Sequence, residues 1–274
     1  MTAANHQHPS TPGLSAATGS WRQRLYRTGV LSLLTVLLPG LALAADIDSA
    51  ALRQQLQSTE RAIADRMRDE ARRPVEVLEF LGLEPGMSVL DVYAADGYFT
   101  LPLAWAVGAE GHVYAQNPTS AAQRSDDPVS PQPETLPGKL ERHALEHVTL
   151  LYQPITRTGL AAESIDFVLV SQILHDYYNR SPARAQAMLH ELYRVLRPGG
   201  VIGVIDHSGA AGNDNARLHR MEQTQAIDAL QAAGFAVEAE SDLLANPADN
   251  PRRSTFDPAL HRRTDQFLLR ARKP

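Results

Sequence analysis

The sequence predicts an α/β fold, a doubly wound and mostly parallel sheet of seven strands with an N-terminal helical extension. Two observations lead to this prediction. From residue 87 onward, short apolar runs typical of buried strands alternate with segments whose apolar residues recur at helical spacing. The chain of 274 residues is also 43% hydrophobic and 21% charged, the usual proportions of a globular protein with an ample core.

The first 44 residues have the composition of a targeting segment. They lack Asp and Glu and contain three arginines, Arg22, Arg24 and Arg27. An uncharged apolar run at 28–45 and the small residues Ala42-Leu43-Ala44 complete the pattern of a secretory signal peptide at about 21–44, after a disordered leader. We therefore expect a periplasmic or secreted chain without stable membrane insertion. A retained membrane anchor is the alternative, and a cytoplasmic location follows if the signal is not used.

The expected elements then follow in order. Apolar residues at helical spacing predict one amphipathic helix at about 49–72, within an extension at 45–73. Pro74 opens the domain at 74–274 and begins a helix that ends at Gly82. Strands are expected at 87–92, 112–115, 148–152, 165–170, 201–206, 235–239 and 266–270, and further helices at 99–107, 185–196 and 221–233. The last two strands have no helix between them, which indicates an antiparallel edge pair.

Two segments break the alternation. The stretch at about 117–138 contains five prolines among Ser, Asp and Gln, and it predicts a solvent-exposed insertion that is either a mobile loop or a lid. The stretch at 241–257 is also rich in proline and is either a surface hairpin loop or a flap at a pocket mouth.

Composition excludes several classes of site and partner. The chain has no Cys, which rules out disulfides, thiolate metal ligands and a cysteine nucleophile. The net charge of −5 becomes −8 once the three arginines of the leader are removed. So acidic a chain is not expected to bind nucleic acid through a broad electrostatic surface, and a small-molecule substrate is the expected partner.

Candidate functional residues lie at the ends of the predicted strands. Ligands of parallel sheets bind beyond the carboxyl ends of the strands. The first strand leads into Asp91-Val92-Tyr93-Ala94-Ala95-Asp96-Gly97, whose small residues allow close approach of a ligand to a helix start. The second strand ends in Gln116-Asn117, and Ser171 follows the fourth.

Two pairs of histidine and aspartate are expected to face the same crevice. His175-Asp176 follows the fourth strand and Asp206-His207 ends the fifth, while His219 precedes the next helix. A histidine beside a carboxylate can deprotonate an acceptor, which makes His175, Asp176 and His207 the candidate catalytic residues. The alternative is that these residues cap turns and fix loops. Their donor types also suit a metal ion, but no ligand spacing supports one, so no metal is predicted.

Together these features resemble a class I S-adenosylmethionine-dependent methyltransferase. The most specific feature of this resemblance is RVLRPGG at 194–200, a helix-turn-strand motif that recurs in that superfamily. The phrases YAQN at 114–117 and VIDHSG at 204–209 are similar to predicted methyltransferases that carry bacterial export signals. The resemblance covers about 74–274.

The resemblance implies a Rossmann-like methyltransferase fold, S-adenosylmethionine as cofactor and methyl transfer to a small-molecule acceptor. The residues that would line the methionine part of the cofactor are Asp91, Tyr93, Ala94, Ala95 and Gly97. Gln116 and Asn117 would lie at the ribose, and Ser171 near the reacting end. The superfamily's Gly-x-Gly-x-Gly stands here as Tyr93-x-Ala95-x-Gly97, and amides replace the usual ribose-binding carboxylate.

Two other classes of function are compatible with the chain. S-adenosylmethionine is made in the cytosol, so export favours an extracytoplasmic small-ligand-binding module on a degenerate methyltransferase fold without methyl transfer. A nicotinamide-dependent oxidoreductase is disfavoured because G-x-G-x-x-G is absent. Neither the methyl acceptor nor an oligomeric state follows from the sequence.

Overall fold

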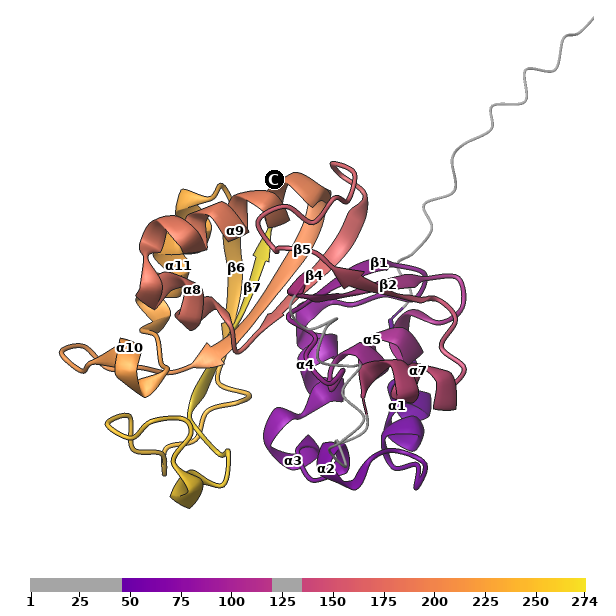
Figure 1. Ribbon diagram of the computed structural model, residues 1–274, viewed down its shortest axis with the longest axis horizontal. Helices are drawn as coiled ribbons and strands as arrows, with labels where there is room; N and C mark the ends of the chain where they lie inside the picture. Colours follow the sequence, from indigo (N-terminus) through magenta and orange to yellow (C-terminus); the bar gives the residue numbers. More distant parts are fainter. Residues whose placement is uncertain (1–45, 120–134) are drawn as a thin grey trace, which may run out of the picture. The chain divides into compact units, whose positions relative to one another are not determined.

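The computed structural model describes residues 46–119 and 135–274, which form one sheet covered by helices on both faces (Figure 1). The helices are α1 (Ser49–Leu56), α2 (Ile63–Arg66), α3 (Asp69–Arg72), α4 (Pro74–Leu81), α5 (Thr100–Val107), α7 (Leu136–Arg142), α8 (Leu174–Arg180), α9 (Pro182–Val195), α10 (Asn215–Leu218), α11 (Gln223–Ala232) and the 3-10 helix η1 (Pro258–Leu260). The strands are β1 (Ser88–Val92), β2 (His112–Asn117), β3 (Val148–Tyr152), β4 (Ile165–Ser171), β5 (Leu196–His207), β6 (Ala236–Ser241) and β7 (Gln266–Arg272). None of the helices in these ranges is long and apolar enough to cross a bilayer. The predicted signal peptide at 21–44 and most of the proline-rich insertion lie outside the described residues.

The sheet has the predicted seven strands, in the order β3-β2-β1-β4-β5-β7-β6. The first five strands are parallel, whereas β7 runs antiparallel to both β5 and β6. The predicted antiparallel pairing of the last two strands is therefore confirmed. The strand order reverses between β1 and β4, and the crevice beyond the carboxyl ends of these strands is where a sheet of this kind binds ligands.

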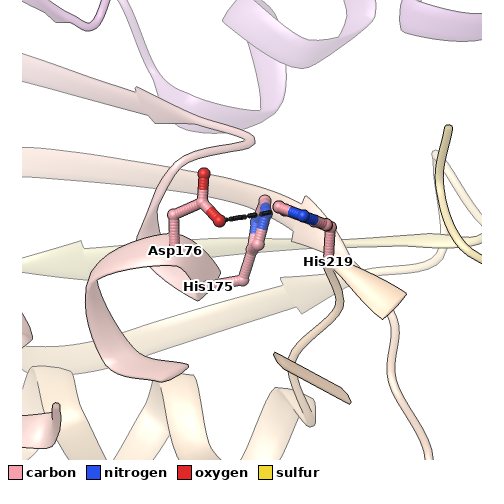
Figure 2. Close-up of side chains that lie close together, drawn as sticks. All are labelled: His175, Asp176 and His219. Atoms are coloured by element: carbon pink, nitrogen blue, oxygen red, sulfur yellow. Dashed lines mark hydrogen bonds and ion pairs between the residues drawn. The ribbon is translucent and has the colours of Figure 1, made fainter. Parts of the chain in front are cut away.

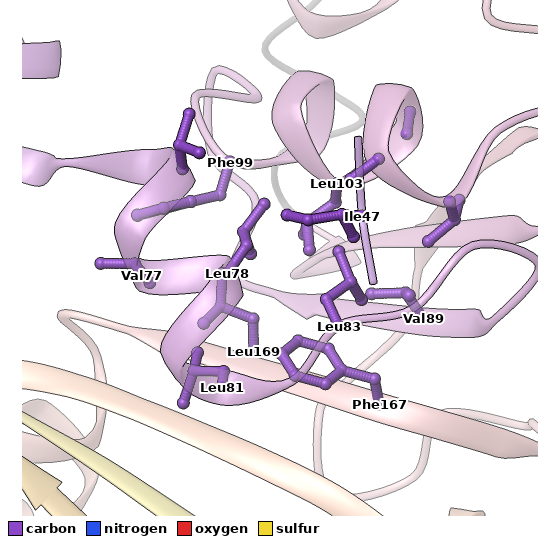
Figure 3. Packing of buried hydrophobic residues seen from close by; sticks show 14 of the residues in the cluster. Ile47, Val77, Leu78, Leu81, Leu83, Val89, Phe99, Leu103, Phe167 and Leu169 are labelled. Carbon is purple, nitrogen blue, oxygen red and sulfur yellow. The ribbon is translucent and has the colours of Figure 1, made fainter. Parts of the chain in front are cut away.

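Successive residues of the central strands enter two separate hydrophobic clusters. Phe167 and Leu169 of β4 pack with α1, α4 and α5 (Figure 3). Val168 and Val170 of the same strand pack with α8, α9 and α11 on the other face. All four side chains are fully buried, and each such burial contributes about 1.5–3 kcal/mol. Burial on both faces explains why the four central residues of this strand, 167–170, are all apolar.

The single helix predicted at 49–72 is wrong, because the structure has three short helices there. The guanidinium of Arg61 is fully buried at the fold-back between α1 and α2. Its Nη1 donates to the last carbonyl oxygen of α1 at 3.1 Å, and its Nη2 donates to Asp69 at 2.8 Å. Ile63 and Met67 of the predicted apolar stripe are instead 68% and 78% exposed.

The RPGG motif at 197–200 forms a bulge at the start of β5. It is not the turn before the strand that the sequence predicts. Ile165 pairs with Leu196, and the next partners are Phe167 and Val201, so one residue of β4 lies opposite four of β5. Gly199 has a φ of +80°, a conformation that glycine adopts without strain.

Candidate active site

A cavity of about 210 Å³ lies beyond the carboxyl ends of β1 and β4. Five of the residues predicted to bind the cofactor line it: Asp91, Tyr93, Ala94, Ala95 and Ser171. The rest of its lining comes from both ends of α3, the loop before α5 and the chain just after β4: Arg68, Arg72, Asp96, Tyr98, Phe99, Gln172 and Ile173. Asp96 lies in the loop that the resemblance places at the cofactor, and Gln172, next to Ser171, is expected near the reacting end. Arg68 and Arg72 were not predicted, because their approach depends on how the N-terminal helices fold back over the sheet.

The loop after β1 has the backbone shape of a glycine-rich turn. Tyr93, Ala95 and Gly97 have φ values of +55°, +52° and +83°. These are the three positions at which the resemblance places glycine, so the left-handed conformation is kept where two of the glycines are replaced. The amide N–H of Tyr93 donates to the side chain of Gln116 at 3.1 Å, and that of Ala95 donates to Asn117 at 2.9 Å. Side chains from β2 thus hold the strained loop in place.

Gln116 and Asn117, which are predicted to lie at the ribose, form hydrogen bonds within the protein. Gln116 is fully buried, Asn117 is 5% exposed, and neither lines the cavity. Nε2 of Gln116 donates to the carbonyl oxygen of Gln153 at 2.7 Å, and Nδ2 of Asn117 donates to that of Ala95 at 3.3 Å. Both side-chain amides form hydrogen bonds within the protein, because the N–H groups of the neighbouring loop need acceptors.

Gly97 also differs from its predicted role at the cofactor. A Cβ built on it would lie 2.4 Å from Cδ1 of Leu136, and its φ is positive. The glycine is therefore required where α7 packs against the loop, and it does not line the cavity.

Replacing Ala95 by glycine is expected to stabilise the protein by up to about 1 kcal/mol, because glycine adopts a positive φ without the steric penalty of a Cβ. Ala94→Gly is the matched control. Ala94 is buried and does not have a positive φ, so this change should destabilise by about 0.5–1 kcal/mol. Urea unfolding of both variants measures the difference, and equal effects would contradict the strain at Ala95.

The cavity holds a half-buried cation, Arg72, and a buried carboxyl group, Asp91, that are not paired with each other. Burial lowers the pKa of Arg72 to about 10, which leaves it protonated at neutral pH. Its Nη2 donates to Oε1 of Gln172 at 2.7 Å, and within the described ranges no carboxylate forms an ion pair with it. Asp91 is 2% exposed and accepts a hydrogen bond from Oγ1 of Thr100 at 2.6 Å, while burial raises its pKa to about 7. Such a cavity offers one site for an anion and one for a cation.

The wall formed by the N-terminal helices is held by aromatic and ionic contacts. The guanidinium groups of Arg72 and Arg68 lie 4.6 and 4.8 Å from the centre of the Tyr98 ring. Arg68 also pairs with Asp96 at 2.6 Å, and the hydroxyl of Tyr98 donates to Asp69 at 2.8 Å. The positions of Arg68 and Arg72 in the cavity therefore depend on the packing of this segment.

The second part of the site is His175 in the first turn of α8. Its Nδ1 lies 2.6 Å from Oδ1 of Asp206, and its backbone N–H donates to the other oxygen at 2.8 Å. A carboxylate only accepts, so Nδ1 carries a proton, and in the neutral ring Nε2 keeps a lone pair. Burial opposes protonation of His175, but the hydrogen bond and charge of Asp206 raise its pKa above the usual value. The fully buried Asp206 thus fixes the orientation of the ring.

Two further side chains converge on Nε2 of His175 (Figure 2). Oδ1 of Asp176 lies 3.4 Å from this nitrogen, and Nδ1 of His219 lies 3.0 Å from the same oxygen. His175 and Asp176 are adjacent in the sequence and were predicted to act together. No specific role was predicted for His219, because only the tertiary fold brings the turn after α10 to this cluster.

His207 has a different environment from the one predicted. Its Nδ1 lies 2.7 Å from Oγ1 of Thr264, and burial lowers its pKa to about 4. The ring centre of His207 is 5.7 Å from that of His175. His207 is therefore neutral at physiological pH. It packs beside the cluster but does not belong to it, because its Nδ1 forms a hydrogen bond with Thr264 in the loop before β7.

The cavity and the histidine cluster are neighbours in the fold. Ile173 lines the cavity and precedes His175 by two residues. Tyr177, on the same helix as His175, packs edge-on against Tyr93 with ring centres 6.1 Å apart. The ring of Tyr93 forms part of the wall and leaves the cavity open.

Comparisons with known proteins agree with this geometry. Residues 90–204 match the family model of a methyltransferase domain. An uncharacterized protein of Mycobacterium tuberculosis strain H37Rv is 35% identical over 124 residues, 45% of this chain and 38% of that protein. A demethylmenaquinone methyltransferase of Listeria monocytogenes serovar 1/2a is 26% identical over 137 residues, 48% of this chain and 50% of the relative. The chain thus spans only 38 to 50% of the length of these relatives.

Solved structures show the same fold. A SAM-dependent methyltransferase from Aquifex aeolicus has a TM-score of 0.55 at 20% identity, covering 83% of this chain and 99% of its own. A geranyl diphosphate methyltransferase in complex with SAM has a TM-score of 0.55 at 15% identity, covering 84% and 97%. The cyclase SpnF has a TM-score of 0.53 at 18% identity, covering 82% and 93%. Because this fold serves more than one reaction, the activity has to be argued from the site.

Proposed function

We propose that this chain, whose residues 90–204 match the family model of a methyltransferase domain, transfers a methyl group from S-adenosylmethionine to a small-molecule acceptor. The observation that supports this best is the charge arrangement of the cavity. Arg72 is half-buried there without an ion pair among the described residues, and the buried Asp91 lines the same cavity. The amino-acid part of S-adenosylmethionine carries one carboxylate and one ammonium group, so it matches this pair of sites.

The residues of the cavity have separate tasks in this proposal. Arg72 binds the cofactor carboxylate by charge-assisted hydrogen bonds, and Asp91 binds the ammonium group. The ring of Tyr93 forms part of the cavity wall and is supported from outside by the ring of Tyr177. When bound, the cofactor supplies an electrophilic methyl group on a sulfonium. The protein's contribution is to position the two reactants and to assist removal of the acceptor's proton.

His175 is the residue that we assign to the acceptor. Its ring is fixed by Asp206, and its Nε2 faces Asp176 and His219. The side chain of Asp176 is 43% exposed and that of His219 is 34% exposed, so an acceptor can approach this end of α8 from solvent. The negative net charge of the chain fits a small-molecule acceptor better than a nucleic acid.

Calorimetry with S-adenosylmethionine and S-adenosylhomocysteine tests the proposal. We expect saturable binding of both, and Arg72→Met should weaken it at least tenfold, because a hydrogen bond between charged groups contributes about 1.5–3 kcal/mol. Arg53→Met is the matched control, because Arg53 pairs with Glu76 on an exposed surface of α1. Absence of binding at millimolar cofactor, or equal weakening by both substitutions, would contradict the proposal.

We further propose that the segment at 21–44 directs export, so that the domain acts in the periplasm or outside the cell. Its arginines, apolar run and small residues before position 45 support this. Fractionation of cells producing the tagged full chain tests it, and an uncleaved chain in the cytosol would contradict it.

A further inference from the structure

We propose that His175, Asp176 and His219 bind a divalent transition-metal ion such as Zn²⁺. Sequence analysis predicted no metal site, because these residues show no ligand spacing along the chain. The structure brings one donor atom from each to within 4.8 Å of the others, and they form the only group of three potential ligands of this kind among the described residues.

The distances within the cluster suit a shared ion. Nε2 of His175 and Nδ1 of His219 lie 3.4 and 3.0 Å from Oδ1 of Asp176. Two ligands bound to zinc at about 2.0–2.1 Å in tetrahedral geometry are roughly 3.3 Å apart. The donor atoms of the two histidines lie within 4.8 Å of each other, so a shared ion also requires these two to approach one another. Two imidazoles and one carboxylate form a set that suits zinc, iron and other first-row divalent ions.

The partners of His175 provide independent support. A histidine that ligates a metal usually donates its other N–H to a carboxylate or a carbonyl oxygen, which fixes the ring and increases its basicity as a ligand. Asp206 does this for His175 at 2.6 Å while it is itself completely buried. A histidine needed only to cap a turn would not require a buried carboxylate on its far nitrogen.

The ring of His219 is also held in place. It follows α10 with a φ of +54°, and it packs edge-on against Phe256 with ring centres 4.6 Å apart. Phe256 is 73% exposed, so its ring does little for the hydrophobic core and instead supports the histidine. A ligand fixed in this way loses less conformational entropy when it binds an ion.

The site is closed on one side and open on the other. The side chain of His175 is 4% exposed, whereas those of Asp176 and His219 are 43% and 34% exposed. Three protein ligands with an open position are typical of catalytic rather than structural zinc sites. With the ion bound, His175 acts on the acceptor as a ligand of the ion and not as a base. The open position can take an oxygen atom of the acceptor, and the ion then favours loss of a hydroxyl proton to solvent. This role for the ion rests on the proposed function, whereas the metal site itself does not.

Metal binding by the full chain tests the proposal without any cofactor. The protein is freed of metal with a chelator, dialysed against Zn²⁺ or Co²⁺ and analysed by elemental mass spectrometry. We expect one ion per chain and, for Co²⁺, visible absorption typical of tetrahedral coordination. His219→Ala and Asp176→Asn should each weaken binding at least tenfold. Asp206→Asn should weaken it 10–100-fold through the orientation of His175.

His190→Ala is the matched control, because His190 is exposed on α9 and should leave the affinity unchanged. Circular dichroism of each variant confirms that it has folded. Failure of the folded wild-type chain to take up metal, or equal affinity of His219→Ala and His190→Ala, would overturn the proposal. Calorimetry with S-adenosylmethionine on the same samples separates the two hypotheses: cofactor binding without metal contradicts only the metal site, and metal binding without cofactor contradicts only the transferase.

Discussion

Asp91→Asn is expected to make the protein more stable at pH 8 and to remove most of its affinity for S-adenosylmethionine. Burial raises the pKa of Asp91 from its ordinary 3.8 to about 7 in the folded chain. The folded state therefore holds this proton more tightly than the unfolded state. The stability that Asp91 contributes is complete below pH 4, is lost as the pH rises to 7 and stays lost above it.

The difference between the two pKa values corresponds to about 4 kcal/mol at pH 8. Asparagine avoids the charge and keeps an acceptor for Thr100, but its NH₂ group then needs a partner. We expect a net gain of about 1–3 kcal/mol in the free energy of unfolding. The gain should shrink towards pH 5, where wild-type Asp91 is largely protonated. A functional carboxylate that is unfavourable for the fold is a common compromise at binding sites.

Asp96→Asn is the control for this prediction, because Asp96 lines the same cavity but has the opposite shift. Burial acts to raise the pKa of Asp96, but the hydrogen bond and charge of Arg68 outweigh it and hold this pKa below its usual range. Asp96→Asn should therefore lower stability at pH 8. Urea unfolding at pH 5 and pH 8 and calorimetry with the cofactor measure both variants. If Asp91→Asn is less stable than wild type at pH 8, or keeps its affinity, the assigned role of Asp91 is wrong.

The fold was predictable from the sequence because its determinants are local. The strand at 165–170 contains the apolar run 167–170 because it is buried on both faces, and its neighbours alternate with amphipathic helices that end at glycine or proline. The helix predicted at 49–72 failed for a reason that is not local. Arg61 has to reach both the end of α1 and Asp69, and no periodicity reveals where its guanidinium is buried.

The candidate site was predictable in part. The residues at the ends of β1 and β4 line the cavity because strand ends of a parallel sheet share one edge. Gln116 also ends a strand, but its amide turns towards the loop, because the N–H of Tyr93 has to find an acceptor. Arg72 and His219 were not assigned to the site, because only tertiary packing brings them to it. Arg72 forms a hydrogen bond with Gln172, and His219 forms one with Asp176, and both partners are distant in the sequence.

Asp65→Leu is expected to destabilise the protein by about 3 kcal/mol and to weaken cofactor binding. Nζ of Lys139 on α7 lies 2.7 Å from Oδ2 of Asp65, and both side chains are at most 3% exposed. Removing one member of a buried pair leaves the other charge unpaired in the interior, which costs about 3–5 kcal/mol. The lower figure applies here, because Asp96 lies 3.8 Å from the same Nζ and can partly replace Asp65.

The double variant Asp65→Leu/Lys139→Met separates this effect from a general loss of packing. It removes both charges and keeps apolar volume, so it should recover most of the stability lost in the single variant. Asp65 also pairs with Arg68, which lines the cavity, so cofactor affinity should stay reduced in the double variant even where stability returns. Glu70→Ala is the control on α3, where an exposed ion pair with Arg263 should contribute no more than about 1 kcal/mol. Urea unfolding and calorimetry of the four proteins give both quantities, and a loss in Asp65→Leu no larger than in Glu70→Ala would show that the buried pair does not anchor the cavity wall.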